Sequence, residues 1–352
     1  MRSKLNLLKD SRIGVAVILL ALVLLIPPLT RVNLYIMEVI LIMMIFTIYS
    51  SAWNLLALSG QASLGHAAFF GIGGYASALI STSLGIPPLI SLLIGGAVSA
   101  VIGFFIGLTC VNLREWFLGM VTFGFALIVQ TIMVGPLAWL TGGWESPVFP
   151  PRLVGGGLPV SVSALYEYYL LLAFTAAIIF LIYRIKESKL GLAFIAIREN
   201  ELEANVMGIN VYRYRLIAFI LSSYLSGVAG ALWAHHFGVI TPEVFGLEYS
   251  FSPVLYCIFG GLGTIEGPIL GTVTIDLLRE ATRPLGWTYE RFILIGGILI
   301  FVVIFMPKGL ISLVKRFFGK GGGSPGGSGP LRIPSSLRRI IGRGRPSLHR
   351  GR

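Results

Sequence analysis

Runs of apolar residues long enough to cross a membrane are the feature that most limits what this chain can fold into. A bilayer core of about 30 Å takes about 20 helical residues. Runs of about that length lie at residues 13–30, 34–58, 67–84, 89–110, 117–140, 166–184, 215–236, 251–275 and 290–306. Only 12% of the residues are charged, about half the share of a soluble domain. The pattern predicts an all-α polytopic membrane protein and excludes an ordinary soluble fold.

The positions of Lys and Arg predict the orientation. Basic residues cluster before residue 13 and again in the loop at 184–214, whereas the loop at 237–250 carries none. Because Lys and Arg of short loops stay in the cytoplasm, we place the two basic segments inside and the third loop outside. The basic tail after Pro307 also favours the cytoplasm. Both termini are therefore expected to be cytoplasmic.

The number of apolar runs conflicts with that orientation, because an odd number of crossings would leave the C-terminus outside. The best place for a missing crossing is 249–283, where "FGGLGTIEGP" interrupts the apolar run. Pro268 and the neighbouring glycines argue against one continuous helix, so we expect two short half-helices or a re-entrant pair. The prediction is a bundle of about 8–10 transmembrane helices, some of them short or broken.

Three parts of the chain follow from composition. Residues 1–12 form a cytoplasmic N-terminus, and residues 13–318 form the transmembrane domain with its cytoplasmic loop at 184–214. Residues 319–352 are rich in Gly, Pro, Ser and Arg and contain no acid, which predicts a disordered basic tail. Clustered arginines next to a membrane attract anionic lipid. The tail has no interleaved aromatic residues, so no nucleic acid is expected as a partner.

Small residues spaced four apart predict where helices pack closely. Three such ladders are Gly95, Ser99, Gly103 and Gly107; Ser222, Ser226, Gly230 and Ala234; and Gly263, Gly267 and Gly271. They indicate a tight bundle but say nothing of what the protein carries.

The loop at 184–214 contains a short helix with both ends marked. Asn200 is a suitable N-cap, Glu203 its capping-box partner, and Glu201 is favourable near the positive end of the helix dipole. Gly208 is placed to end the helix in a left-handed conformation. Such a short helix needs docking to be stable, and Leu202 and Val206 give it an apolar face. The pattern fits a helix that another protein binds, and equally an amphipathic segment lying on the membrane surface.

Two polar interruptions of apolar runs are candidates for the substrate pathway. A polar break at membrane depth persists only inside protein or beside water, and broken helices can bind ionised solutes. An ordinary turn between two spans explains the first break as well, and His66 alone is more often a packing residue than a proton relay. The candidates are Ser59, Gly60, Gln61, Ser63 and His66 in the first break, and Gly260, Gly261, Gly263 and Glu266 in the second.

Several motifs are missing from the sequence. It contains no G-x-x-x-x-G-K-[ST] phosphate loop, no H-E-x-x-H and no paired C-x-x-C. His235 and His236 adjoin a span end and are weak metal candidates. We therefore expect neither an enzyme, nor an ATP site, nor a metal or cofactor in this chain.

Three blocks in order resemble the permease subunit of branched-chain amino acid ABC transporters, the LivM type. They are "NLLALSGQASLGHAAFFGIGGYASALI", "IRENELEANVMGINVYRYRLIAFILSSYLSGVAGALWA", and "GGLGTIEGPILGTVTIDLLRE" with "FMPKGL". The resemblance covers about residues 35–315. The broader importer loop pattern, Glu-Ala-Ala followed by glycine, is matched here only by Ala204 and Gly208. The basic tail is not part of the family pattern.

The resemblance implies a function and a set of partners. The helix Asn200–Gly208 would be the coupling element that inserts into an ATP-binding subunit. The partners would be a second, LivH-like permease, two cytosolic ATP-binding subunits that hold ATP-Mg, and an extracytoplasmic substrate-binding protein. The expected substrates are leucine, isoleucine and valine, moved across a prokaryotic inner membrane by alternating access. Urea, short amides or other amino acids are alternative substrates, and an ATP-independent secondary transporter is the alternative mechanism.

Overall fold

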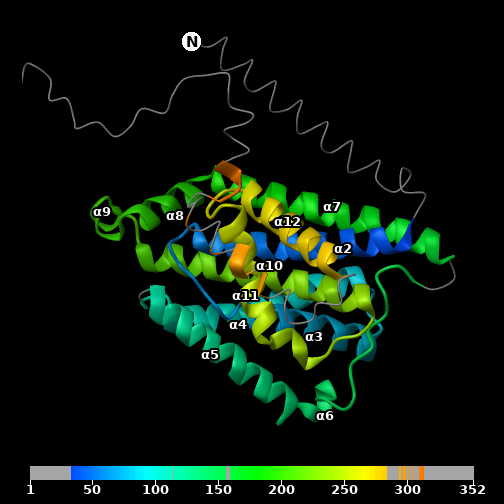
Figure 1. Cartoon of the computed structure of the whole chain (residues 1–352). Coiled ribbons are helices and arrows are strands. Elements are labelled where there is room, and N and C mark those ends of the chain that lie inside the picture. Colours follow the sequence, from blue (N-terminus) through cyan, green and yellow to red (C-terminus); the bar gives the residue numbers. More distant parts are fainter. Residues whose placement is uncertain are drawn as a thin grey trace, which may run out of the picture. The chain divides into compact units, whose positions relative to one another are not determined.

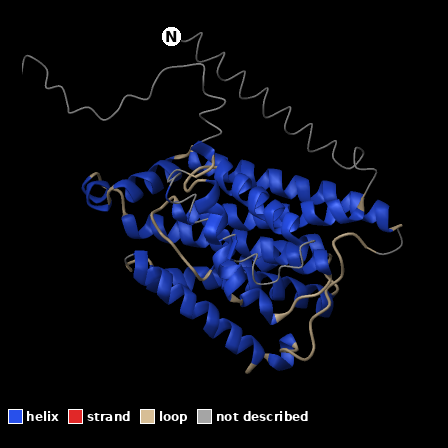
Figure 2. Cartoon of the chain, viewed as in Figure 1, coloured by secondary structure: helices blue, strands red, loops and turns tan. Residues whose placement is uncertain are grey.

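The computed structural model describes residues 33–113, 115–155 and 159–283, together with 293, 294, 296–298, 300, 304 and 309–312. The regular elements of this part of the chain are helices, with one isolated β-bridge between Val148 and Ile240. Figure 2 shows the helical architecture. The predicted all-α class is confirmed. The apolar run at 13–30, most of the run at 290–306, the N-terminus 1–12 and the tail 319–352 lie outside the described residues.

Six of the described helices are long and apolar enough to cross a membrane. Five cover predicted runs with shifted ends, and Gly135 with Pro136 ends α5 earlier than its run, because proline disfavours helix in the residue before it. The long helices are α2 (Leu34–Ala57), α3 (His66–Leu84), α4 (Pro88–Cys110), α5 (Glu115–Val134), α7 (Val160–Lys186) and α10 (Val211–Phe237). The short α6 (Ala138–Thr141) follows α5, as Figure 1 shows.

Helix α10 packs against both α3 and α4, and small residues form the contacts. A methyl group on Gly230 would overlap the backbone carbonyl of Phe70, and one on Gly73 would overlap the backbone of Gly227. The Ser99 hydroxyl lies between the other two helices, at 3.0 Å from the Phe69 carbonyl and 2.9 Å from the Ser223 carbonyl. The first two predicted ladders are therefore confirmed as close helix contacts.

The predicted interruption of the run 251–275 is confirmed. Helix α11 (Leu247–Gly260) ends at the glycine break and α12 (Glu266–Thr282) follows it. Gly267 and Gly271, from the third ladder, have no room for a side chain because the carbonyls of Gly261 and Tyr256 occupy that space. The two helices run in opposite directions, since Gly260 meets Gly267 while Tyr256 meets Asp276.

Pro253 lies inside α11, and a side chain of α2 compensates for the backbone hydrogen bond that this proline cannot make. A proline cannot donate to the carbonyl four residues before it, which here belongs to Tyr249. The hydroxyl of Tyr49, on α2, donates to that carbonyl at 2.9 Å. The backbone group that the proline releases is thus satisfied inside the bundle, as burial requires.

The connection from α10 to α11 turns back into the bundle. It contains the short 3-10 helix η1 (Pro242–Phe245), and the Phe245 ring lies against Gly71 and stacks on Tyr75 of α3. Helix α11 therefore begins among the long helices instead of at their ends. Helices α11 and α12 then run in opposite directions on the two sides of the glycine break.

Candidate functional site: the capped helix α9 and the two polar breaks

Two short helices occupy the predicted cytoplasmic loop. Helix α8 (Lys189–Glu199) was not predicted, and α9 (Glu201–Val206) is the predicted capped helix. Figure 1 shows both at the end of the bundle where α7 stops and α10 starts. A side chain on Gly191 would overlap the carbonyls of Ile185 and Lys186. Glycine there lets the first turn of α8 lie close against the end of α7.

The N-terminus of α9 has the predicted cap with one change. The Asn200 Oδ1 accepts from the backbone N–H groups of Leu202 (3.1 Å) and Glu203 (3.3 Å). The Glu203 carboxylate does not return to the backbone N–H of Asn200, as a capping box requires. It accepts from the Asn200 Nδ2 at 2.7 Å, because the Asn200 N–H already donates to the Ala196 carbonyl at the end of α8. Asn200 thus ends one helix and begins the next.

The C-terminus of α9 closes as predicted on Gly208. This residue has φ +84°, a left-handed conformation that glycine adopts without strain. Its N–H donates to the Asn205 carbonyl, and the Ile209 N–H reaches back to the Ala204 carbonyl, both at 3.0 Å. This pair of bonds is the Schellman motif. A six-residue helix thus has hydrogen bonds defining both ends.

Helix α9 is anchored on one face and bare on the other. Arg215 of α10 donates two hydrogen bonds to the Glu201 carboxylate, at 3.2 and 2.9 Å, and Ala204 is buried. The opposite face carries Leu202, Val206 and Met207, which are 77%, 90% and 81% exposed. A groove of about 450 Å³ adjoins the anchored side, between α9 and the start of α10.

The first polar break forms a packed connection between α2 and α3. His66 begins α3, and its Nε2 lies 2.6 Å from the Ser222 hydroxyl of α10. Because that hydroxyl donates to the Ala52 carbonyl at 2.7 Å, the His66 Nε2 is the donor to Ser222. The ring therefore ties three helices together, which is the contact of a packing histidine.

The other residues of this break are also placed by the fold. Ser59 donates to the Leu56 carbonyl at 2.7 Å, and the Ser63 carbonyl accepts from the Trp53 Nε1 at 2.6 Å. Gly60 has φ +78° and lies against the Arg198 backbone of α8. Gln61 is buried, and neither atom of its amide has a hydrogen-bond partner among the described residues.

The second break lies beside the first, which the sequence did not indicate. The Asn54 Nδ2 donates to the Thr264 carbonyl at 2.6 Å, and its Oδ1 accepts from the Gly263 N–H at 2.9 Å. Lys186, at the end of α7, donates to the Gly263 carbonyl at 2.9 Å. The Arg198 guanidinium also lies against Gly263. Both interruptions therefore meet α8 at the end of the bundle where α7 stops.

The remaining pathway candidates surround the end of α11. Gly260 packs against Gly267, Gly261 has φ +131°, and Glu266 is exposed in the first turn of α12. Gly309 lies against Gly261, and the Leu310 N–H donates to the Phe259 carbonyl at 2.9 Å. Gly309 and Leu310 therefore lie against the end of α11. A role of these residues in substrate passage stays a prediction.

We expect Asn54→Leu to lower stability, because it leaves the half-buried Gly263 N–H and Thr264 carbonyl without their partners, at a cost of up to about 1–3 kcal/mol each. The midpoint of thermal unfolding in detergent should fall by several degrees. Ser83→Ala is the control, since the Ser83 hydroxyl is exposed and bonds only to the preceding turn. Equal midpoints for the two variants would show that Asn54 does not hold the second break.

Two buried polar networks were missed by the sequence reading. His236 of α10 lies between two carboxylates, 2.8 Å from Glu167 and 3.2 Å from Glu38. His235 contacts Ser77, Ser91 and the Pro151 carbonyl. Among the described residues no group of three His, Cys, Asp or Glu side chains is arranged to hold a metal ion. The contacts of His236 with Glu38 and Glu167 therefore join α10 to α2 and α7.

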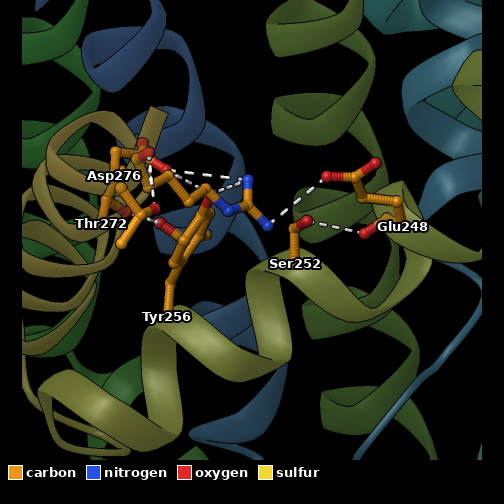
Figure 3. A network of polar contacts seen from close by, with 8 residues as sticks. Glu248, Ser252, Tyr256, Thr272 and Asp276 are labelled. Carbon is orange, nitrogen blue, oxygen red and sulfur yellow. Dashed lines mark hydrogen bonds and ion pairs between the residues drawn. The ribbon is translucent and has the colours of Figure 1, made fainter. Parts of the chain in front are cut away.

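The second missed network joins α11 to α12. Asp276, on α12, is buried, and its Oδ1 accepts from the Tyr256 hydroxyl at 2.7 Å. Arg279 donates to the same hydroxyl at 3.2 Å. Figure 3 shows Glu248, Ser252 and Tyr256 of α11 beside Thr272 and Asp276 of α12.

Comparison with known proteins gives consistent matches. Residues 35–303 match the family model described as "Branched-chain amino acid transport system / permease component". The high-affinity branched-chain amino acid transport system permease protein LivM of Salmonella typhimurium is 29% identical over 77% of this chain and 69% of its own length. A probable LivM of Methanocaldococcus jannaschii is 24% identical over 69% of this chain and 77% of its own. The high-affinity branched-chain amino acid transport system permease protein LivH of Escherichia coli is 27% identical over 36% of this chain and 41% of its own length. No solved structure matches the chain.

Proposed function

Because the chain belongs to the family of permease components of branched-chain amino acid transport systems, we propose that it is the membrane-spanning permease subunit of an ABC importer for leucine, isoleucine and valine. The six membrane-length helices make it a multi-pass membrane protein, and relatives in bacteria and an archaeon support the inner membrane of a prokaryote. The relatives are transport permeases, not enzymes.

The proposal includes the partners that transport requires. Similarity to both LivM and LivH proteins supports a pair of related permeases, of which this chain is the LivM-type member. We assign ATP-Mg binding to two cytosolic subunits and no cofactor to this chain. A substrate-binding protein outside the membrane would deliver the amino acid.

Helix α9 is the observation that carries the proposal. It is closed by hydrogen bonds at both ends, anchored by Arg215, and bears three exposed apolar side chains. Exposed apolar side chains on a helix that is held in place are expected of a docking surface. A simple connecting loop does not need them. Its anchor on α10, which packs against α3 and α4, gives a rigid path from a moving ATP-binding subunit to the bundle. Closure of the ATPase dimer would thereby switch the pathway between its two faces.

We expect Val206→Asp to weaken binding of the ATP-binding subunit at least tenfold. Val206 is 90% exposed, so the folded permease tolerates a carboxylate there. Burying that charge against a partner costs more than the 1.4 kcal/mol that corresponds to a factor of ten. The measurement is the amount of ATP-binding subunit that co-purifies with the tagged permease from its native membrane.

Leu192→Asp is the matched control, because Leu192 of α8 is also exposed and receives the same charge. It should retain the ATP-binding subunit. Co-purification of wild-type permease with a second permease and ATP-binding subunits, and ATP-driven uptake of labelled leucine by that complex, would support the function. Recovery of this chain alone, active without ATP, would contradict it, and uptake of urea or an amide in place of leucine would change the substrate.

A further inference from the structure

Helices α11 and α12 hold a cluster of charged side chains. Glu248, Ser252 and Tyr256 are spaced four apart and so share one face of α11, as Figure 3 shows. From α12, the Arg279 guanidinium lies 3.5 Å from Glu248, 3.8 Å from Asp276 and 5.9 Å from the centre of the Tyr256 ring. One cation therefore faces two carboxylates.

The cluster lies about halfway through the bundle. Phe46 is midway along α2, and its ring contacts the rings of both Tyr249 and Tyr256, at 6.2 and 5.8 Å between centres. The Ser50 and Thr272 hydroxyls, 3.1 Å apart, align α2 with α12. Because Thr264 meets Asn54 and Thr272 meets Ser50, α12 runs in the direction opposite to α2. Arg279 follows Thr272 by seven residues, which at a rise of about 1.5 Å each is about 10 Å. That distance leads from the level of Ser50 back to near the middle of α2.

Charges at this depth cannot face lipid. Intramembrane ionisable groups lie toward the bundle interior or a water-filled cavity. Yet the Glu248 side chain is 57% exposed and the Arg279 side chain 24% exposed in the single chain. The face of α11 and α12 that carries them must therefore meet water or another protein surface, and not lipid.

The cluster is also incompletely paired. Charge-assisted hydrogen bonds between a guanidinium and a carboxylate are about 2.7–2.9 Å long, whereas both Arg279 pairs are longer than 3.4 Å. The Asp276 Oδ2 is buried and has no hydrogen-bond partner among the described residues. One guanidinium and two carboxylates thus keep bonding capacity for a ligand that carries both signs of charge.

We propose that this cluster binds the zwitterionic head of an α-amino acid during its passage. The guanidinium of Arg279 would bind the ligand carboxylate, and Glu248 with Asp276 would bind the ammonium group. Adjacent opposite charges on the protein match the adjacent opposite charges of the ligand. The inference rests on the proposed transport function and adds to it a recognition site within this chain.

The test uses the full permease–ATPase complex in detergent without the substrate-binding protein. Binding is measured by saturation-transfer NMR for leucine, for isopentylamine, which keeps only the ammonium group, and for 4-methylpentanoate, which keeps only the carboxylate. Leucine should bind at least tenfold more tightly than either analogue. Arg279→Gln should weaken leucine and 4-methylpentanoate at least tenfold but spare isopentylamine, and Glu248→Gln should weaken leucine and isopentylamine but spare 4-methylpentanoate.

Two further variants separate recognition from structure. Arg283→Gln removes an exposed arginine from the residue that ends α12 and should leave all three affinities unchanged. Arg279→Lys keeps the charge and should restore part of the leucine binding. If Arg279→Gln lowers thermal stability but binds leucine like wild type, the cluster is only a tie between helices and the proposal is wrong.

The same preparations keep this proposal distinct from the transport function. A wild-type complex that drives ATP-dependent leucine uptake but binds leucine no better than its analogues overturns the recognition site and leaves the function intact. A complex that contains the ATP-binding subunits and transports no branched-chain amino acid overturns both.

Discussion

Gly208→Val is expected to reduce ATP-driven leucine uptake and recovery of the ATP-binding subunit at least tenfold, with little change in the stability of the bundle. Gly208 has φ +84°, where a residue with a side chain costs about 1–2 kcal/mol and a β-branched one more. Nothing lies within 4 Å of a Cβ built at this position, so the effect is conformational strain and not a clash. A six-residue helix has little stability of its own to absorb that cost.

Gly208→Asn provides the matched control, because asparagine adopts the left-handed conformation more readily than other residues do. It should retain most of the uptake, and Gly208→Ala should fall between the two. Co-purification of the ATP-binding subunit, uptake by the reconstituted complex and the thermal midpoint of the permease are measured together. Normal association and uptake in the valine variant would show that the left-handed end of α9 plays no part in coupling.

Gly230→Ala is expected to lower the stability of the helix bundle sharply. The added methyl group would overlap the carbonyl of Phe70 where α10 crosses α3. The obstacle is rigid backbone, so a rotamer change cannot relieve the contact and the helices must separate. Overpacking of this kind costs about 1–3 kcal/mol or more. The yield of monodisperse protein and its thermal midpoint in detergent should both fall sharply.

The control for this variant is Gly124→Ala on α5, where nothing lies within 4 Å of the added methyl group. Alanine is preferred over glycine inside a helix by roughly 0.5–1 kcal/mol, so the control should be neutral or slightly more stable. Equal midpoints for the two alanine variants would mean that the α3–α10 contact yields easily, against the close approach of the two backbones.

Local patterns in the sequence were sufficient for features that depend on neighbouring residues. The cap at Asn200, the left-handed end at Gly208 and the break before Glu266 each follow from residue types within a few positions of one another. Their conformations are set by backbone sterics and nearby hydrogen bonds. The Glu203 contact differs from the prediction because a second helix, α8, uses the Asn200 N–H, and α8 itself had no cap signal that we detected.

Features that depend on distant residues were not predictable. Asn54 and Gly263 are far apart in the chain, yet one side chain bonds the backbone of the other. Asp276 is far from Tyr256 along the chain, yet it shares a buried network with Tyr256 and Arg279. Neither relation leaves a periodic or local signal. The first arises only when α2 packs beside the second break, and the second only when α12 packs against α11.

The sequence by itself determined the class of protein, its membrane-length helices and the ends of helix α9. The transfer of apolar side chains out of water and the sterics of the backbone both act residue by residue. Only the tertiary structure decided that the first and second breaks lie side by side next to α8. It also decided that the opposite charges of Glu248 and Arg279 meet about halfway along α2. Those arrangements depend on which helices pack together, and packing is settled by the whole set of close contacts at once.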